Sequence, residues 1–313
     1  MYKGQAVAVV VPAYNEEQHI VATLQDMPAF VDSVIVVDDG STDATVERVS
    51  AFSAQEKRVS LLLNEGNQGK GTAVVRGCRE AISTGAAIVA LMDGDHQMPA
   101  QHLGELLDPL VQDGYDASKG NRFIGLGEGL AAMPKYRLLG NVVLTMLTKL
   151  ASGYWSLFDS QNGYWAFRAQ TLTRLNLARL ARRYDLENSL LINLNVIGAR
   201  IKDVGIPARY ADEKSKIRIW RDMPRIMATL CVGFWRRIFY RYVIHDFHPV
   251  ALFLFAGLFL SVVGTGFGIK AVADSLGEPA ATTGTVMLSV LPLLIGVQLL
   301  LAALVLDILS EPK

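Results

Sequence analysis

The chain is 313 residues long and carries 30 acidic and 30 basic side chains, so its formal net charge is zero. Neutrality argues against a nucleic-acid partner, because nucleic-acid-binding domains usually carry a basic excess. Hydrophobic residues make up 51% of the chain and the mean hydropathy is +0.27, which is high for a wholly soluble enzyme. The two cysteines, Cys78 and Cys231, show neither metal-ligand spacing nor a disulfide framework, so we interpret both as small apolar side chains.

Three apolar stretches of strand length run directly into polar or acidic residues. The stretches are residues 6–11, 34–37 and 86–92, and they are followed by Pro12-Ala13-Tyr14-Asn15-Glu16-Glu17, Asp38-Asp39-Gly40-Ser41 and Asp93-Gly94-Asp95. Ligands of open α/β sheets bind at the carboxyl ends of the strands. The three junctions therefore predict one shared cleft.

Asp93 and Asp95 are the most informative of these residues. Two carboxylates separated by one small residue can bind a hard divalent cation, and such a cation normally also holds phosphate oxygens. The same spacing occurs in ordinary surface turns. Its position at the end of an apolar stretch favours chemistry on a diphosphate.

The remaining elements alternate between helix and strand. They are a helix over 44–52 capped by Ser41-Thr42-Asp43, a strand over 59–63, helices over 72–83 and 101–112, and a strand near 117–119. The loop at 64–71 is not a Walker phosphate loop, because Asn64 and Gly71 stand where that motif needs glycine and a hydroxyl residue. This alternation predicts an α/β fold with a mostly parallel sheet covered by helices on both faces.

The last fifth of the chain is strongly apolar. Residues 250–269 and 286–306 contain no charged side chain, and each is long enough to cross the bilayer as a helix. Buried core helices are the alternative, but Gly257, Gly264 and Gly266 suit membrane packing better. We predict two transmembrane helices at about 250–270 and 285–307.

The stretch at 217–242 mixes aromatic and methionine side chains with arginines. It is either soluble core or a basic amphipathic helix in the membrane interface, and its place before a membrane span favours the second. The predicted organisation is therefore a catalytic domain at 1–215, juxtamembrane helices at 216–245 and a membrane domain at 246–313.

Charged residues around the spans predict their orientation. Arg236, Arg237 and Arg241 precede the first span and Lys313 follows the second. Because positive residues concentrate on the cytoplasmic side, we expect both termini and the catalytic domain there. The N-terminus reads directly into a strand, and no signal peptide is expected before it.

Five motifs in order resemble the family 2 glycosyltransferases with the GT-A nucleotide-diphospho-sugar fold. Among these, the chain is most similar to polyprenyl-phosphate glycosyltransferases such as dolichyl-phosphate mannose synthases and bactoprenyl-phosphate glucosyltransferases. The similarity covers residues 6 to about 220. The motifs are Val11-Pro12-Ala13-Tyr14-Asn15-Glu16, Val37-Asp38-Asp39-Gly40-Ser41-Thr42-Asp43, Asn67-Gln68-Gly69-Lys70-Gly71, Met92-Asp93-Gly94-Asp95-His96-Gln97-Met98-Pro99 and Asp159-Ser160-Gln161-Asn162-Gly163-Tyr164.

The resemblance implies a role for particular residues. The donor nucleotide would contact Pro12, Tyr14, Glu16, Asp39, Lys70 and Asp93. Asp95 and Gln97, with the donor diphosphate, would hold Mg²⁺ or Mn²⁺, and Asp93 would lie against the ribose or the metal. The catalytic set would be Asp95, Arg122, Arg137 and Asp159, with the arginines on phosphate and Asp159 on the acceptor side. Gln161, Lys214 and Lys216 would contact phosphate or acceptor.

The implied reaction is an inverting, metal-dependent transfer of a hexose from a UDP- or GDP-sugar to the phosphate of a membrane polyprenol. Gln161-Asn162-Gly163-Tyr164-Trp165 lacks the arginine of processive polysaccharide synthases, which argues against polymer synthesis. Two alternatives stay open, namely transfer to another lipid or a growing glycan, and a non-catalytic nucleotide-sugar-binding membrane protein. The sequence also leaves open the base, the hexose, undecaprenyl or dolichyl phosphate as acceptor, and a homo-oligomeric state.

Overall fold

The computed structural model describes the chain except for residues 125–134, 184, 208–218 and 277–281, and it does not describe the side chains of 135–139 and 219–222. The chain forms two compact units, Met1–Phe234 with Pro312–Lys313, and Trp235–Glu311. The division falls within one helix, α9 (Ile219–Phe239). The predicted boundary at 215 lies outside the described residues.

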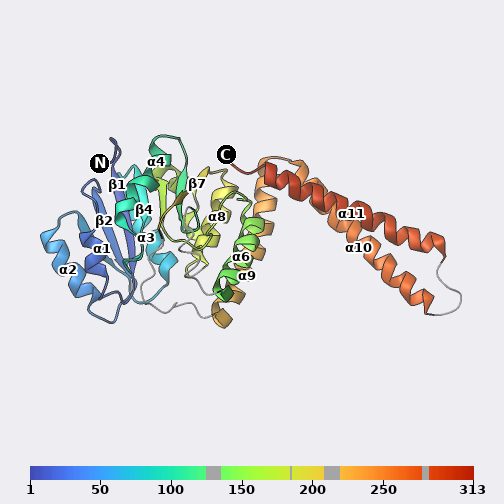
Figure 1. The fold of residues 1–313 in the computed structure, drawn as a ribbon, viewed down its shortest axis with the longest axis horizontal. Coiled ribbons are helices and arrows are strands. Elements are labelled where there is room, and N and C mark those ends of the chain that lie inside the picture. The colour runs from blue at the N-terminus through green and yellow to red at the C-terminus, as the bar shows by residue number, and fades with distance from the viewer. Residues whose placement is uncertain (125–134, 184, 208–218, 277–281) are drawn as a thin grey trace. The chain divides into compact units, whose positions relative to one another are not determined.

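A seven-stranded sheet with helices on both faces forms the centre of the first unit (Figure 1). Its strand order is β3-β2-β1-β4-β6-β5-β7. All pairs are parallel except those of β6, which runs antiparallel to both β4 and β5. The strands are β1 (Val7–Ala13), β2 (Ser33–Asp38), β3 (Val59–Leu63), β4 (Ile88–Leu91), β5 (Ala117–Asn121), β6 (Trp165–Arg168) and β7 (Ile201–Gly205). The predicted mostly parallel α/β sheet is confirmed.

Helices and short helical turns connect the strands. The first unit contains α1 (Ile20–Gln25), α2 (Thr45–Gln55), α3 (Lys70–Ser83), η1 (Ala100–His102), α4 (Leu103–Val111), α6 (Lys135–Ser152), α7 (Ala169–Arg174), η2 (Leu177–Arg179), α8 (Leu186–Val196) and most of α9. Helix α3 begins two residues earlier than predicted. Its N-cap, Gly69, has a φ of 100°, and a Cβ there would collide with the carbonyl oxygen of Arg182, so only glycine fits this turn.

The central strands are apolar throughout because both faces of the sheet are covered. Successive side chains of a strand point to opposite faces. In β1, Ala8 and Val10 pack into a core with α3, α7 and α8, whereas Val7, Val9 and Val11 pack into a second core with α1, α2 and α4. This double burial explains the unbroken hydrophobic stretches of the sequence.

A third, smaller core joins α6, α8 and α9. Its buried residues are Leu144 and Ala151 of α6, Ile192 of α8, and Ile226 and Leu230 of α9. The N-terminal part of α9 is therefore packed onto the first unit, while Met223, Met227 and Val232 on the same helix are exposed. Helix α9 thus combines a buried face with an exposed apolar face.

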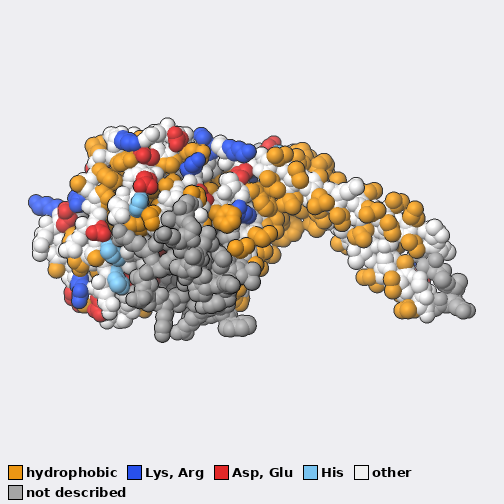
Figure 2. Space-filling model, in the orientation of Figure 1, with side chains coloured by type: hydrophobic (Ala, Val, Ile, Leu, Met, Phe, Trp, Pro, Cys, Tyr) orange, Lys and Arg blue, Asp and Glu red, His pale blue; other side chains and the backbone are white. Residues whose placement is uncertain are grey.

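The second unit consists of the end of α9, the π-helical turn η3 (Tyr240–His245), α10 (Pro249–Ser275) and α11 (Thr283–Leu309). Among the described residues, α10 and α11 are the helices long and apolar enough to cross a membrane. Hydrophobic side chains cover their visible surface (Figure 2). The two helices approach closely at glycine, since a Cβ on Gly257 would lie 3.0 Å from the carbonyl oxygen of Gly296.

Candidate donor and acceptor site

The carboxyl ends of β1 and β4 meet, as the three apolar stretches predicted. A Cβ placed on Gly94 would lie 3.4 Å from the carbonyl oxygen of Pro12 and 3.6 Å from the Cβ of Ala13. The neighbouring β2 ends at Asp38, and Asp39 follows it, almost fully buried. The acidic residues after β2 and β4 thus lie at one edge of the sheet, where open α/β sheets bind ligands.

Asp39 holds the loop that precedes α3. Its Oδ1 accepts hydrogen bonds from Asn64 Nδ2 at 2.9 Å and the backbone N–H of Gln68 at 3.1 Å, and its Oδ2 accepts from the backbone N–H of Gly69 at 2.7 Å. A carboxylate has about four lone-pair sites, so these three bonds leave capacity for one more donor. Asp39 remains suited to accept an N–H from a nucleobase.

Lys70, in the first turn of α3, connects two carboxylates that are distant in the sequence. Its Nζ lies 2.8 Å from a carboxylate oxygen of Asp93 and 3.1 Å from Glu187 Oε1 in the first turn of α8. Burial disfavours the charged form of Lys70, but the carboxylates of Asp93 and Glu187 outweigh it and raise its pKa. Lys70 is therefore a fixed positive charge beside Asp93.

Asp95 lies near other negatively charged side chains. Burial and the Asp93 carboxylate raise the pKa of Asp95 to about 6, and Glu16 adds to this, while the backbone N–H of Gln97 and the charge of Lys70 oppose it. The backbone N–H of Gln97 donates to Asp95 Oδ1 at 3.1 Å, so the two residues predicted to hold the metal ion lie side by side. A carboxylate destabilised by its carboxylate neighbours suits a divalent cation.

Among the described residues, no three His, Cys, Asp or Glu side chains are placed to hold a metal ion by themselves. Mg²⁺ is usually bound by one or two carboxylates together with substrate phosphates, and Asp95 with Gln97 and Asp93 fits that arrangement. His96, within the same motif, has its Nε2 2.9 Å from Asp26 Oδ2, so its ring is engaged by Asp26.

Arg122 and Asp159, predicted separately, form one ion pair. Arg122 Nε and Nη2 each donate to a different oxygen of Asp159 at 2.7 Å, and the Arg122 backbone N–H adds a third bond at 3.1 Å. Burial alone would raise the pKa of Asp159, but the hydrogen bonds and charge of Arg122, with the charge of Lys119, hold it below its ordinary value. Asp159 is thus an ionised carboxylate whose orientation is fixed.

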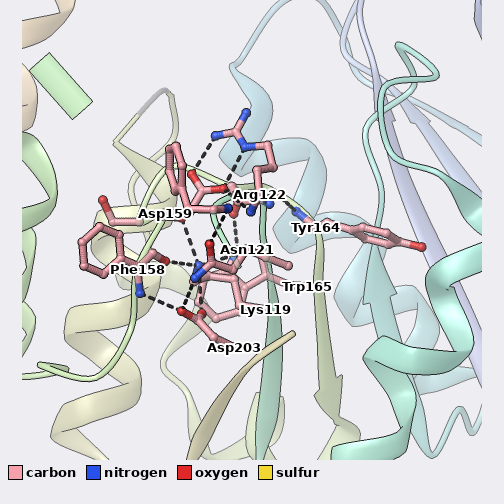
Figure 3. Close-up of polar contacts among 12 residues, drawn as sticks. Lys119, Asn121, Arg122, Phe158, Asp159, Tyr164, Trp165 and Asp203 are labelled. Carbon is pink, nitrogen blue, oxygen red and sulfur yellow. Dashed lines mark hydrogen bonds and ion pairs between the residues drawn. The ribbon is translucent and has the colours of Figure 1, made fainter. Parts of the chain in front are cut away.

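Lys119 lies next to the Arg122–Asp159 ion pair and binds the backbone that carries Asp159 (Figure 3). Its side chain has no exposed surface, and its Nζ donates to the carbonyl oxygens of Phe158 at 2.6 Å and Asp159 at 3.0 Å. The same Nζ forms an ion pair of 3.2 Å with Asp203 of β7, and Asp203 Oδ2 accepts from the backbone N–H of Phe158 at 2.7 Å. These contacts fix the segment in which Asp159 adopts a φ of 49°.

The segment after Asp159 reaches Lys70 and Asp93. A Cβ on Gly163 would lie 2.8 Å from Lys70 Nζ and 3.0 Å from Asp93 Oδ2, so this glycine packs against the Lys70–Asp93 pair. Gln161 Nε2 donates to Asn188 Oδ1 at 3.0 Å, which ties its side chain to α8. The structure therefore brings residues 159–163 together with the acidic end of β4.

The other predicted site residues divide into two groups. Pro12 and Glu16 are buried at the end of β1, and Tyr14 between them is 40% exposed. The side chain of Arg137, on α6, and both Lys214 and Lys216 lie outside the described residues, so their assignments stay predictions.

Sequence reasoning missed Lys119, Glu187 and Asp203. A lysine inside the short β5 strand was the one visible signal for Lys119, since charged residues are rarely buried unless paired. Glu187 gave no signal, because its partner Lys70 is 117 positions away.

Comparisons with known proteins agree with this geometry. The sequence profile described as Glycosyl transferase family 2 matches residues 8–175. The UDP-N-acetylglucosamine–dolichyl-phosphate N-acetylglucosaminyltransferase of Methanococcus voltae is 28% identical over 217 residues, covering 65% of this chain and 86% of that protein. The dolichyl-phosphate hexose transferase of Haloferax volcanii is 29% identical over 218 residues, covering 69% and 88%.

A solved structure shows the same fold. The glucosyl-3-phosphoglycerate synthase of Mycobacterium tuberculosis, in complex with Mn²⁺, UDP and glucosyl-3-phosphoglycerate, superposes with a TM-score of 0.56 at 22% identity. The match covers 75% of this chain and 80% of that chain. The sheet described above is therefore of the GT-A type.

Proposed function

The chain belongs to glycosyl transferase family 2, and on that premise we propose that it transfers a hexose from a UDP- or GDP-sugar to the phosphate of a membrane polyprenol, with inversion at the sugar. One observation carries the proposal, namely the convergence of Lys70, Asp93 and Asp95 at the end of β4. The two relatives named for dolichyl-phosphate transfer support the acceptor class. The apolar helices α10 and α11 support a membrane location.

Asp95, Gln97 and Asp93 would hold Mg²⁺ or Mn²⁺ with the donor diphosphate. When bound, the cation offsets negative charge that develops on the leaving diphosphate. Lys70 supplies a second, permanent positive charge beside Asp93, preorganised by its two carboxylate partners. Asp39 would accept an N–H of the base and so orient the donor.

In the transfer, an oxygen of the acceptor phosphate forms a bond to the anomeric carbon as the bond from that carbon to the diphosphate oxygen breaks. The acceptor phosphate has a second pKa of about 6, so it is mostly a dianion at neutral pH and needs no strong base. The fixed Arg122–Asp159 pair is suited to position this phosphate, because its guanidinium attracts the phosphate charge while Asp159 holds the guanidinium in place.

The test uses the purified full chain in lipid nanodiscs with Mn²⁺. UDP-glucose, UDP-N-acetylglucosamine and GDP-mannose are each offered with a polyprenyl phosphate, and in parallel with a soluble sugar acceptor. We expect EDTA-sensitive transfer of one donor's sugar to the lipid phosphate, with an inverted anomeric configuration in the product. Preference for the soluble sugar, or transfer that EDTA leaves unchanged, would contradict the proposal.

We also propose that the first unit lies on the cytoplasmic side of the membrane, as the charges of Arg236, Arg237 and Arg241 favour. The two cysteines give a direct test. Cys231 is exposed, whereas Cys78 is buried and its burial raises the pKa of its thiol to about 12, so a membrane-impermeant maleimide should label Cys231 alone. Labelling of Cys231 is expected in inside-out vesicles. Labelling in intact cells would show that the first unit lies on the opposite side of the membrane.

A further inference from the structure

Asn64, the residue after β3, lies between Asp39 and Arg76 of α3. Its Nδ2 donates to Asp39 Oδ1 at 2.9 Å, and its Oδ1 accepts from Arg76 Nη1 at 2.8 Å. Arg76 Nη1 also donates to the carbonyl oxygen of Leu63 at 2.6 Å, which anchors the guanidinium to the end of β3. The three side chains form a continuous chain of hydrogen bonds from an exposed arginine to a buried carboxylate.

Only one orientation of the Asn64 amide satisfies both neighbours. A guanidinium only donates hydrogen bonds, and an ionised carboxylate only accepts them. The amide must therefore turn its carbonyl toward Arg76 and its NH₂ toward Asp39. Without Arg76, the amide can flip and present its carbonyl oxygen to the carboxylate, which repels it.

The orientation of Asn64 affects the acceptor site of Asp39 that is still available to a ligand. Asn64 and the N–H of Gln68 occupy Oδ1, whereas within the described part of the chain Oδ2 accepts the N–H of Gly69 alone. The remaining acceptor site of Asp39 therefore lies on Oδ2, and the bonds to Oδ1 set the direction in which Oδ2 points.

We propose that Asn64, oriented by Arg76, is a positioning residue that holds Asp39 for recognition of the imino N–H of the donor base. This rests on the proposed nucleotide-sugar donor. The imino group is N3–H in uracil and N1–H in guanine, and each is a single donor that pairs with one carboxylate oxygen. The pair Asn64–Arg76 thereby strengthens recognition of a base that carries an imino N–H, without touching the base.

The test measures base recognition inside each variant. Dissociation constants of UDP, GDP, N3-methyl-UDP and N1-methyl-GDP are measured by calorimetry with the full chain in detergent and Mn²⁺. Methylation removes the imino hydrogen, so the ratio of the methylated to the parent dissociation constant reports this one contact. We expect a ratio of about ten or more for the preferred nucleotide in the unmodified chain, as for a hydrogen bond to a charged group.

In Asn64→Leu and Arg76→Leu we expect the parent nucleotide to bind about tenfold more weakly and the ratio to fall toward one. Arg76→Lys, which keeps a donor, should restore part of the ratio. Arg79→Leu is the matched control, because Arg79 is on the same helix and lines the same surface cavity of about 650 Å³ as Arg76 and Asn64. It should leave the ratio unchanged.

Because the ratio is internal to each protein sample, a partly folded variant still gives an interpretable result. An unchanged ratio in Asn64→Leu and Arg76→Leu overturns the inference while leaving the nucleotide donor intact. Equal weakening of parent and methylated nucleotides also overturns it, since that pattern marks a general structural loss. Failure of the unmodified chain to bind either UDP or GDP refutes the proposed donor itself.

Discussion

Two lysines of the first unit pair with carboxylates in opposite electrostatic settings. Lys70 is 28% exposed and pairs with Asp93 and Glu187, and Asp93 lies near the further carboxylate of Asp95, so negative charge is in excess. Lys119 is fully buried, with one carboxylate partner, Asp203, and three carbonyl oxygens. The Lys70 cluster is thus short of positive charge, whereas the Lys119 cluster is balanced.

We interpret this difference as one between a proposed functional cluster and a structural cluster. A buried charge is tolerated when it is paired and its hydrogen bonds are satisfied, which describes Lys119. An accessible cluster with negative charge in excess can bind a ligand of opposite charge, and perturbed pKa values of this kind gather at functional sites. A divalent cation would balance the Lys70 cluster, and changes to each cluster should therefore have different consequences.

The largest expected effect concerns the Lys70 cluster, in which negative charge is in excess. Asp95→Asn removes one anionic ligand from the proposed cation site and should lower transfer by about 100-fold or more, while the unfolding midpoint changes little. Transfer is measured with increasing Mn²⁺, and Asp113→Asn, an exposed residue after α4, is the control. Full activity of Asp95→Asn would remove Asp95 from the metal site.

In the balanced Lys119 cluster, a substitution should affect the free energy of unfolding more than the rate of sugar transfer. Lys119→Met leaves the Asp203 carboxylate, whose side chain is 10% exposed, without its cation and should lower the free energy of unfolding by about 3–5 kcal/mol. Adding Asp203→Asn removes the stranded charge and should recover part of that loss. Urea unfolding in detergent measures both. A Lys119→Met protein as stable as the parent would show that the pair is not a structural element.

The sequence was sufficient for the sheet and for its acidic edge. Unbroken apolar stretches predicted strands buried on both faces, and polar residues directly after them predicted which edge of the sheet is acidic. Asp93 and Asp95 were found in this way. Their signal is local, because strand and motif adjoin in the chain.

Pairings between distant segments could not be predicted. Arg122 and Asp159 were assigned separate roles, but they form a single ion pair across 37 positions. The antiparallel insertion of β6 between β4 and β5 depends on contacts with both neighbours and leaves no periodic signal in a four-residue strand. Lys119 and Glu187 were missed for the same reason, since their partners are known only once the chain is folded.

Gly163 offers a way to disturb the Lys70 cluster without changing its charges. A Cβ there would lie 2.8 Å from Lys70 Nζ, so Gly163→Ala should displace the lysine side chain from Asp93. We expect about a tenfold loss of transfer with a nearly unchanged unfolding midpoint, because the displaced group is the flexible end of a side chain. Gly140→Ala, where a Cβ meets no atom within 4 Å, is the control. Equal activity of the two variants would show that the position of Lys70 is not important.

The smallest expected effect is a shift in acid stability at the Arg122–Asp159 pair. The pKa of Asp159 in the folded chain is below its ordinary value of 3.8, so the stability from its ionised form is present above that value and is lost as the pH falls through the folded value. In Arg122→Leu, burial acts without the opposing guanidinium and raises the pKa of Asp159, so acid unfolding should begin at a higher pH, by less than about one pH unit.

Circular dichroism during acid titration measures this shift. The double variant Arg122→Leu with Asp159→Asn carries no titrating carboxyl at that position, so the additional pH dependence introduced by Arg122→Leu should disappear in it. Acid midpoints that coincide in Arg122→Leu and the unmodified chain would mean that Arg122 does not set the ionisation of Asp159. The bidentate Arg122–Asp159 pair would then serve only to hold the backbone. Arg122 would belong with the balanced, structural Lys119 cluster and not with the Lys70 cluster, in which negative charge is in excess.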